Sequence, residues 1–526
     1  MGEPRGTGAV LGRLLLAFDG TDLPGPTAAR LAERPAAGVT LYRHLNVADP
    51  RQLRALTGAI QRLAPTGVPF LVAIDQEGGQ LLGLGAESTP FAGNMALGAT
   101  DDAALAERVA GAIGRELRAC GVNVNYAPVC DLATNPANPS LGVRSFGDDA
   151  DRVAPMVAGF VRGLTAGGVA ATLKHFPGKG GAAIDTHHRP ATLDGSRHQF
   201  DAVELAPFRA GMEAGASLVM SAHAAVPALT GRADLPATLS RAVMHDLLRH
   251  DLGFTGVALS DAFDMGALGD ANQRAALAVD GLDAGLDLIL SGPSDAGRPE
   301  LDDALLAAEA GDVFDPSAVE AALARIAALR RRLADAPQPE LEVVSCVEHR
   351  ALAAELAERS LTLVRDTAGL LPLRLGPESS IAVVMPRPAN LTPADTSNTE
   401  RPGLAAAIRR RHPRVTEYLV APNPDEDEVA AAVAALRGHD LLVVATAAAS
   451  FQPGQSNLAR ALLATGLPTV TVALRTPWDL LTYPDAGTHV CTYSILEPSL
   501  EALAGALFGE RGFPGRLPVR IDGLDR

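Results

Sequence analysis

Eight short apolar runs alternate with longer segments of helical spacing over residues 1–335. Strands that alternate with helices pair in parallel through βαβ units, and eight such units in one domain predict a closed (β/α)8 TIM barrel. An open doubly wound sheet is the alternative that fits the same alternation. The runs are Arg13–Phe18, Gly38–Tyr42, Phe70–Asp75, Val122–Ala127, Ala170–His175, Ser217–Ala222, Gly256–Asp261 and Leu286–Gly292.

The proline-rich stretch Ala336–Glu340 interrupts this alternation. We expect residues 1–335 to form the barrel, residues 336–345 a stiff polar linker and residues 346–526 a second domain, an αβα sandwich. This region contains no G-x-x-x-x-G-K-S/T or G-x-G-x-x-G motif, which argues against a nucleotide site. Its apolar runs are Leu361–Val364, Ile381–Met385, Val415–Val420, Leu441–Ala445, Thr469–Leu474 and Val490–Ser494.

Composition excludes several kinds of partner. The net charge of -16 argues against nucleic acid or an anionic membrane surface as the main partner. No window approaches the ~20 apolar residues of a membrane span, and the first apolar run is too short for a signal sequence. We therefore expect a cytoplasmic protein. The four cysteines are scattered without metal-ligand spacing, and we expect neither a metal nor another cofactor.

Polar side chains close most of the apolar runs in the first 335 residues. In a (β/α)8 barrel the chemistry lies at the carboxyl ends of the strands, so these side chains are expected to gather around one pocket. The residues in question are Asp75, Asn125, Lys174, His175, Ser221, His223, Asp261 and Ser291.

The stretch KHFPGKGGAAIDTH, residues 174–187, combines a strand end with a glycine-rich loop. Lys174 and His175 stand at the strand end, where they suit the binding of a polar substrate. His187 is a candidate proton donor because an imidazole exchanges protons near neutral pH, and Asp185 could fix its tautomer. An exposed loop histidine is the alternative interpretation. A metal site built from His175, Asp185, His187 and His223 lacks any recognised ligand spacing.

Asp261 ends the seventh run, where a rigid carboxylate would suit nucleophilic attack on the anomeric carbon of a sugar. A helix N-cap is an equally good interpretation of that residue taken alone. Asp75, which begins D-Q-E-G-G, could grip sugar hydroxyls or cap a turn. Arg144 lies in a long loop after the fourth run, a position that is more often surface than ligand.

Together these motifs resemble the family 3 glycoside hydrolases, specifically their β-N-acetylglucosaminidase branch. The branch carries K-H-F-P-G-x-G followed by D-[ST]-H, D-x-E-G-G, N-x-A-P-V-x-D, R-S-F-G, P-A-T-L-S and a segment leading to the nucleophile. The matching residues here are 174–180, 185–187, 75–79, 125–131, 144–147, 236–240 and 247–261. The resemblance covers the whole predicted barrel and extends into the second region, as in two-domain members.

The resemblance implies a retaining mechanism on β-linked N-acetylglucosamine. Asp261 would be the nucleophile, and His187 paired with Asp185 would act as acid and then base. The remaining residues implied to bind substrate or line its pocket are Asp75, Arg144, Lys174, His175, His223 and Met265. The partner would be a small carbohydrate, and the protein would be a monomer or a homodimer.

Two departures from the family pattern bear on substrate choice. Many members carry an Arg shortly after Glu-Gly-Gly, where this chain has Gln80–Leu84 with Gly83 and no Arg, and many carry His in place of Lys179. Lys179 would add positive charge to the mobile loop. Peptidoglycan fragments of cell-wall recycling, chitin-derived disaccharides and aminosugar metabolites all remain open as substrates.

Two other functions fit the same residues. A neutral imidazole does not repel an anion, so inorganic phosphate could replace water and the chain could be a phosphorylase that forms a sugar 1-phosphate. A non-catalytic sugar-binding or sensor protein on the same scaffold is the second alternative, although binding alone requires none of Asp185, His187 and Asp261.

Overall fold

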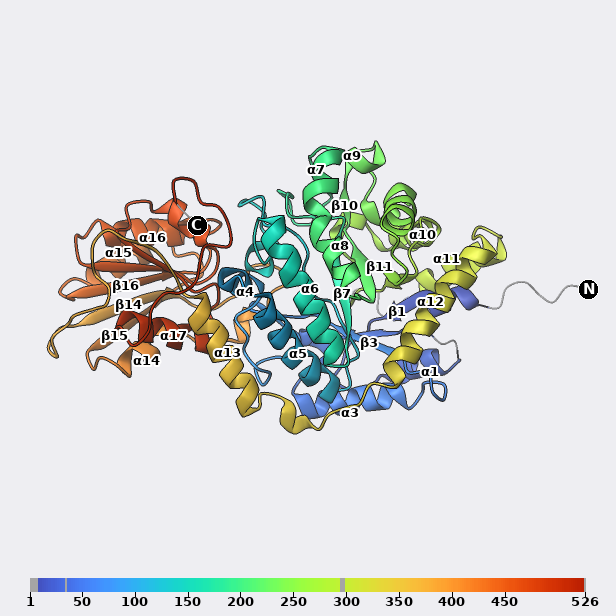
Figure 1. Cartoon of the computed structure of the whole chain (residues 1–526), viewed down its shortest axis with the longest axis horizontal. Coiled ribbons are helices and arrows are strands. Elements are labelled where there is room, and N and C mark those ends of the chain that lie inside the picture. The colour runs from blue at the N-terminus through green and yellow to red at the C-terminus, as the bar shows by residue number, and fades with distance from the viewer. Residues whose placement is uncertain (1–7, 34–35, 294–298, 525–526) are drawn as a thin grey trace, which may run out of the picture.

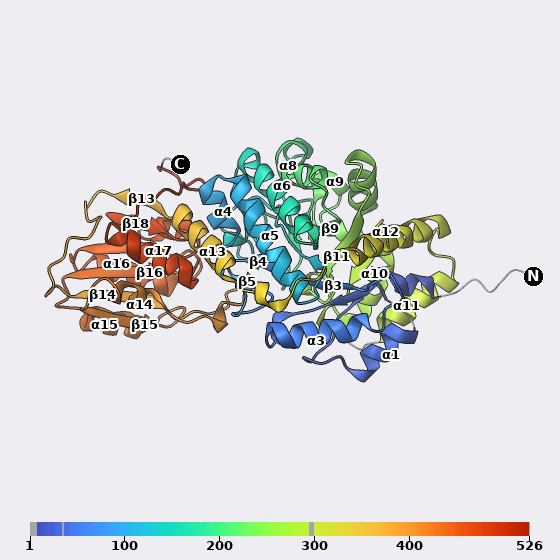
Figure 2. The same cartoon turned by 60° about the horizontal axis from the view of Figure 1, so that its bottom comes forward.

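The computed structural model describes residues 8–33, 36–293 and 299–524, which form two lobes side by side (Figure 1). The N-terminal lobe is built around a barrel, and the C-terminal lobe around a second sheet. Helix α13 (Val347–Ser360) runs along the junction, and the view turned by 60° shows the same arrangement (Figure 2). Among the described residues, no helix combines the length and apolarity that membrane crossing requires.

Eight parallel strands close the barrel as the alternation predicts, so the open doubly wound sheet is wrong. Closure follows from β1 (Leu14–Leu16), which pairs with both β2 (Gly38–Thr40) and β12 (Leu288–Leu290). Every strand lies beside the one that precedes it in the chain around the barrel. The other strands are β3 (Leu71–Ile74), β6 (Val124–Asn125), β7 (Ala170–Phe176), β9 (Leu218–Ser221) and β11 (Val257–Ala262).

Helices surround the barrel, and its loops carry one short antiparallel hairpin and one short parallel strand pair. Asp102 and Asp149 cap α5 and α6 by accepting hydrogen bonds from backbone N–H groups of the first turn. The helices are α1 (Gly25–Glu33), α2 (Arg43–Asn46), α3 (Pro50–Gln61), α4 (Asn94–Thr100), α5 (Ala103–Ala119), α6 (Ala150–Ala166), α7 (Arg197–Gln199), α8 (Ala206–Glu213), α9 (Pro227–Thr230), α10 (Ala271–Asp283), α11 (Pro299–Ala310) and α12 (Pro316–Ala334). Two π-helices are η3 (Phe200–Glu204) and η5 (Ala242–Asp251). The 3-10 turns are η1 (Ala9–Arg13), η2 (Gly142–Arg144), η4 (Ala237–Leu239), η6 (Gly266–Leu268) and η8 (Leu341–Val343). Two strand pairs lie outside the barrel sheet: β4 (Gln76–Gly78) with β5 (Leu81–Leu82), and β8 (Ala191–Thr192) with β10 (Ala224–Ala225).

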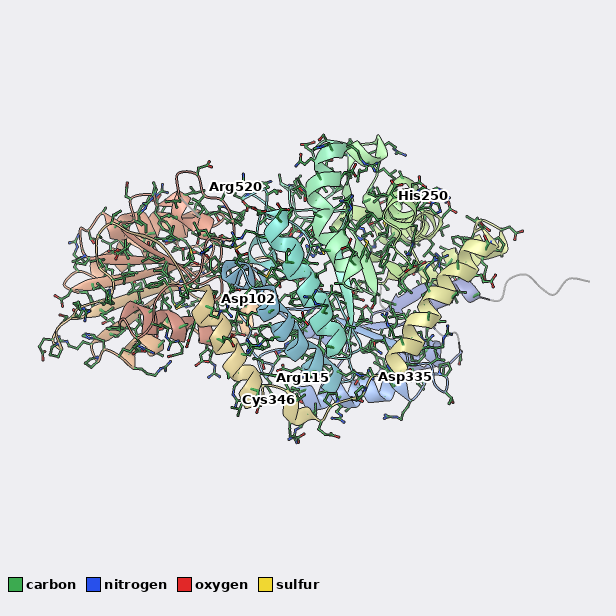
Figure 3. All side chains as sticks on the ribbon, in the orientation of Figure 1. Asp102, Arg115, His250, Asp335, Cys346 and Arg520 are labelled. Atoms are coloured by element: carbon green, nitrogen blue, oxygen red, sulfur yellow. The ribbon has the colours of Figure 1, made fainter. Side chains whose placement is uncertain are left out.

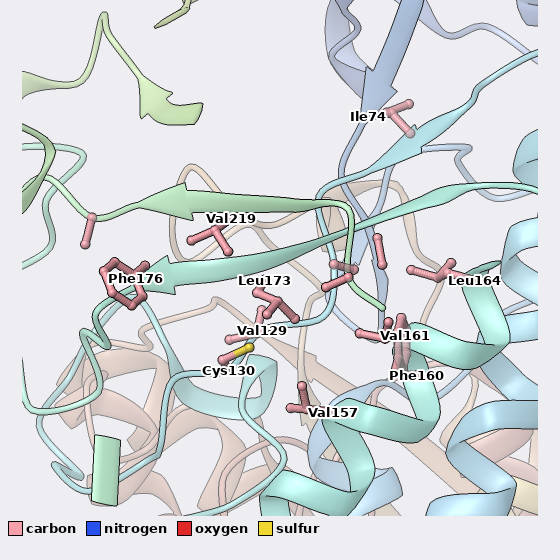
Figure 4. Close-up of a cluster of buried hydrophobic side chains, with 14 of the residues drawn as sticks. Ile74, Val129, Cys130, Val157, Phe160, Val161, Leu164, Leu173, Phe176 and Val219 are labelled. Atoms are coloured by element: carbon pink, nitrogen blue, oxygen red, sulfur yellow. The ribbon is translucent and has the colours of Figure 1, made fainter. Parts of the chain in front are cut away.

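The alternation of side chains along each strand builds two cores. Outward-facing residues such as Leu173 and Val219 pack against the helices, and Figure 4 shows them beside Phe160 and Val161 of α6. These side chains are fully buried, and each contributes about 1.5–3 kcal/mol through removal of apolar surface from water. Inward-facing residues fill the barrel itself, which is therefore a packed scaffold below its upper rim.

The C-terminal lobe is a three-layer αβα sandwich around a six-stranded mixed sheet. Odd-numbered residues of β14 pack against α14 and α17, whereas even-numbered residues pack against α15 and α16. The strands are β13 (Thr362–Asp366), β14 (Ile381–Pro386), β15 (Val415–Val420), β16 (Leu441–Thr446), β17 (Thr469–Ala473) and β18 (Thr488–Cys491), of which β13 runs antiparallel to β18. The helices are α14 (Leu404–Arg409), α15 (Glu426–Ala435), α16 (Pro453–Leu463) and α17 (Glu497–Leu507), with the 3-10 turns η9 (Ser397–Thr399) and η10 (Pro477–Thr482).

Helix α13 is bonded to the barrel lobe along its length. Arg359 forms an ion pair with Asp102 at one end of α5, and the His349 ring lies 2.7 Å from the Glu116 carboxylate near the other end. In Figure 3, Asp102 lies near one end of α5 and Arg115 near the other, close to Cys346 at the start of α13. The antiparallel pair of α5 and α13 thus ties the lobes together beside the barrel.

Candidate active site

A cavity of about 520 Å³ lies at the carboxyl ends of the barrel strands, beneath a loop of the C-terminal lobe. This volume is typical of small-molecule sites, which span ~300–1,000 Å³. Seven of the nine residues expected at the site line the cavity, whereas Asp185 and His223 lie behind its wall. The seven are Asp75, Arg144, Lys174, His175, His187, Asp261 and Met265.

Strand periodicity explains why three of these side chains face the cavity. Successive side chains of a strand point to opposite faces, so residues two apart share a face. Asp75, Lys174 and Asp261 each continue the inward-facing series of their strand, beyond the packed interior. The inward residues before them are Leu71 and Ala73 in β3, Ala170 in β7, and Val257 and Leu259 in β11.

A buried ionic cluster forms one side of the cavity. The Lys174 ammonium lies 2.5 Å from both Asp75 Oδ1 and Glu77 Oε1, and Arg144 binds Glu77 through Nε at 2.9 Å and Nη2 at 2.8 Å. Burial alone would raise the pKa of Glu77, but Arg144 and Lys174 outweigh it and hold that pKa well below its usual range. The two cations are therefore held rigidly, and Asp75 keeps the more exposed carboxylate of the cluster.

The Asp261 carboxylate faces the cavity with one oxygen already engaged. Its Oδ1 atom accepts a hydrogen bond from the backbone N–H of Ala262 at 2.9 Å, and Oδ2 lies 3.9 Å from His175 Nε2. Burial would raise the pKa of Asp261, but the cationic groups around it, among them the Lys179 ammonium, outweigh burial and keep that pKa low. The carboxylate is thus ionised at neutral pH, and Oδ2 is the oxygen left for other chemistry.

His187 and Asp185 form a hydrogen-bonded pair at the edge of the cavity. His187 Nδ1 lies 2.6 Å from Asp185 Oδ1, which also accepts the His187 backbone N–H at 3.0 Å. The His187 carbonyl in turn accepts from Gly266 N–H at 2.9 Å, which ties this loop to the segment that follows Asp261. With Nδ1 engaged by Asp185, Nε2 is the ring nitrogen available to a ligand.

His175 and Lys179 are organised by a second buried carboxylate, Asp131. Asp131 Oδ2 lies 2.7 Å from His175 Nδ1, and Oδ1 accepts the backbone N–H of Lys179 at 2.8 Å. Burial lowers the pKa of His175 well below its ordinary value, so the ring is neutral. Lys179, expected to add positive charge to this loop, has a buried side chain, and its Nζ finds no hydrogen-bond partner among the described residues.

His223 does not reach the cavity, which corrects its expected role in substrate binding. Its Nδ1 lies 2.8 Å from the Thr238 hydroxyl and its Nε2 lies 3.1 Å from the Ala262 carbonyl, so both ring nitrogens are occupied. The ring is buried and edge-on to Phe263. It therefore braces the strand end that carries Asp261.

A loop of the C-terminal lobe, residues 390–399, roofs the cavity. Asp395 anchors the loop through a buried ion pair with Arg475 at 2.8 Å, and its carboxylate also accepts the backbone N–H groups of Leu391 and Ser397. The backbone carbonyl of Gln80, next to the β4–β5 hairpin, accepts the Thr396 N–H at 2.8 Å. The C-terminal lobe thus contributes directly to the wall of the site.

Sequence reasoning did not find several residues that organise the site. Glu77 was visible inside D-Q-E-G-G, and Asp131 ended a family motif, but neither spacing revealed the groups that these carboxylates hold. The roof loop and Arg475 carry no local signal, because they lie 100 or more residues beyond Leu290, the end of the last barrel strand. Among the described residues, no group of three His, Cys, Asp or Glu side chains is arranged to hold a metal ion.

Comparison with known proteins places this geometry in context. Residues 25–329 match the family model for the glycosyl hydrolase family 3 N-terminal domain. A Pseudoalteromonas piscicida protein named β-hexosaminidase A is 34% identical over 67% of this chain and 63% of its own length. A Cellulomonas fimi protein named β-N-acetylglucosaminidase/β-glucosidase is 31% identical over 86% of this chain and 84% of its own length. The solved structure of a family 3 β-N-acetylglucosaminidase from a Paenibacillus species covers 98% of both chains, with 33% identity and a TM-score of 0.91.

Proposed function

The chain belongs to the family 3 glycosyl hydrolases, and we propose that it is a retaining β-N-acetylhexosaminidase that releases terminal β-linked N-acetylglucosamine. The observation that carries the proposal is the convergence of Asp261 and the His187–Asp185 pair on one cavity, from the end of β11 and from the loop after β7. Paired groups of this kind can attack a sugar and protonate its leaving group in one step.

In the first step Asp261 Oδ2 forms a bond to the anomeric carbon while the bond from that carbon to the leaving oxygen breaks. Protonated His187 donates its Nε2 proton to the leaving oxygen and becomes neutral. Asp185 stabilises the protonated ring through Nδ1 and fixes which nitrogen carries the transferable proton. In the second step neutral His187 removes a proton from water as the water displaces Asp261, which restores the free carboxylate with net retention.

The ionic cluster would bind the sugar before either step. Asp75 accepts hydrogen bonds from sugar hydroxyls. Lys174 holds the Asp75 carboxylate in place and Arg144 holds that of Glu77, while Met265 supplies an apolar contact. His175 borders Asp261 as a neutral ring and limits its motion. These roles follow from position and charge, and each is a proposal for mutational study.

Turnover of an aryl β-N-acetylglucosaminide tests the proposed function. The intact protein should release the phenol and produce the β-anomer of N-acetylglucosamine first, as seen by NMR before mutarotation. Asp261→Ala should abolish turnover and spare binding of free N-acetylglucosamine. Initial formation of the α-anomer would contradict the retaining mechanism, and absence of turnover with intact sugar binding would support a sensor instead.

Phosphorolysis is a second candidate, because the proposed acid-base residue is a histidine instead of a carboxylate. A carboxylate that has lost its proton repels phosphate, whereas neutral His187 does not. Phosphate could then take the place of water and yield N-acetylglucosamine 1-phosphate. The test is the same assay with and without inorganic phosphate. Faster turnover and a 1-phosphate product support phosphorolysis, and unchanged rate and product exclude it.

A further inference from the structure

Arg43 is a cation of the cavity wall that no carboxylate neutralises in the described part of the chain. It begins α2, directly after the end of β2, and its Nη1 donates to the carbonyl of Val47 within the same turn. By contrast, Lys174 and Arg144 at the same cavity are both bound to buried carboxylates. Within the part of the chain that the structure describes, the buried Nε of Arg43 has no hydrogen-bond partner, which is uncommon for a buried polar group and calls for an explanation.

One glycine in the segment that follows β5, Gly85, provides the space that Arg43 occupies. A Cβ atom at Gly85 would lie 2.4 Å from Arg43 Nε and 2.8 Å from its Cζ, so the guanidinium rests against the bare backbone. Gly85 also has a φ of +80°, which side-chain-bearing residues rarely adopt. Packing against Gly85 therefore fixes where the charged group lies.

The same segment cannot place a cationic side chain of its own beside Asp75. Gly83 lines the cavity, and a Cβ atom there would lie 2.3 Å from the Asp75 carbonyl oxygen and 2.8 Å from the Ile74 side chain. Position 83 thus accepts no side chain in this backbone conformation. Arg43 rests against Gly85, two residues after Gly83, and its guanidinium is the one available to this side of the cavity.

We propose that Arg43 binds the sugar whose glycosidic bond is broken, and that it supplies from the start of α2 the guanidinium that position 83 cannot carry. This inference rests on the proposed function. A sugar hydroxyl both donates and accepts hydrogen bonds, so it can donate to Asp75 and accept from Arg43 at once. Because the guanidinium comes from a different element of the barrel lobe, its donors approach the sugar along a new direction, which makes Arg43 a determinant of sugar selectivity.

Substitutions at Arg43, with binding of the free sugar as a readout, test the proposal. Arg43→Ala should weaken inhibition by free N-acetylglucosamine by roughly ten- to a hundredfold, the usual effect of losing a hydrogen bond to a charged group. It should lower kcat/KM by the same factor for two aryl N-acetylglucosaminides with different leaving groups. Arg43→Lys should restore part of the loss, because an ammonium keeps the charge without the planar donors.

Two further variants separate this role from a structural one. Gly85→Ala leaves Arg43 in place but displaces its guanidinium, and should reproduce the weaker sugar binding. Arg51→Ala, in the exposed first turn of α3, should change neither parameter. Thermal unfolding and circular dichroism show whether each variant folds. If Arg43→Ala does not fold, Arg43→Lys and Gly85→Ala carry the test.

An unchanged inhibition constant in Arg43→Ala overturns the proposal. A loss of kcat/KM confined to one leaving group, with sugar inhibition intact, also overturns it and places Arg43 against the leaving group. Failure of the proposed function gives a different result, because the intact protein would then bind N-acetylglucosamine in an Arg43-dependent manner without hydrolysing any aryl glycoside.

Discussion

The Asp185 carboxylate holds His187 through two contacts to a single oxygen, the ring Nδ1 at 2.6 Å and the backbone N–H at 3.0 Å. Residues two apart in a loop can make both contacts only if the chain turns tightly between them. The ring orientation is thus set locally by the loop itself. Burial would raise the pKa of Asp185, but the hydrogen bond from His187 outweighs it and holds that pKa below its ordinary value.

Asp185→Asn tests this arrangement. The amide cannot stabilise a protonated ring, so we expect kcat to fall by roughly 10²- to 10⁴-fold with a poor leaving group that needs protonation. The loss should be much smaller with an activated phenol that leaves without a proton. Asp201→Asn, at an exposed ion pair on η3, is the matched control and should have no effect. Equal losses for both leaving groups would contradict a role in proton donation.

Removal of Arg475 tests the roof loop. Arg475 and Asp395 have side chains that are 5% and 0% exposed, so Arg475→Ala leaves a buried carboxylate without its partner. We expect the free energy of unfolding to fall by about 3–5 kcal/mol and KM to rise, because the loop that lines the cavity loses its anchor. Arg108→Ala, which breaks the exposed pair with Glu355, should cost about 1 kcal/mol or less. Equal costs for the two variants would refute the anchoring role.

The raised pKa of Glu204 predicts a distinctive dependence of the free energy of unfolding on pH. This carboxyl lies beside Gly178, and its buried Oε2 has no hydrogen-bond partner among the residues that the structure describes. Burial raises its pKa from 4.5 to about 7, assisted by Asp131. Between these values the unfolded chain has lost the proton and the folded chain keeps it, so the free energy of unfolding falls as pH rises from 4.5 to 7.

Glu204→Gln removes this titration. The variant should be more stable than the parent above pH 7, by up to about 3 kcal/mol, and the difference should vanish towards pH 4.5. Chemical denaturation across this range measures it. Glu213→Gln, exposed on α8, is the control and should follow the parent at every pH. A variant that is most stabilised at low pH would show that the sign is wrong.

Periodicity predicted the barrel well because each strand in it is a compact apolar run, most of them with a polar residue at the end. It also predicted which face Asp75, Lys174 and Asp261 share, since alternate residues of a strand point the same way. It could not place His223, whose strand-end position resembles that of Asp261 although both ring nitrogens are used internally. It could not anticipate the burial of Lys179, which follows from the folding of its loop onto Asp131.

The contacts that build the roof of the site lie outside the reach of sequence patterns. Arg475 and Asp395 pair within the C-terminal lobe across 80 residues, and Thr396 lies 316 residues from its barrel-lobe partner Gln80. No periodicity connects positions so distant, and the roof of the site emerges only when both lobes are folded together. Arg43 was missed for a related reason, because its importance depends on the space left by Gly85.

Trapping of the glycosyl-enzyme tests the central claim most directly. A slow N-acetylglucosaminyl fluoride with a second fluorine at C5 should add the mass of one fluorinated sugar to the intact protein, and peptide mapping should place it on Asp261. Asp261→Asn should acquire no such mass. An adduct on another residue, or turnover of the reagent by the parent without any adduct, would contradict attack by Asp261.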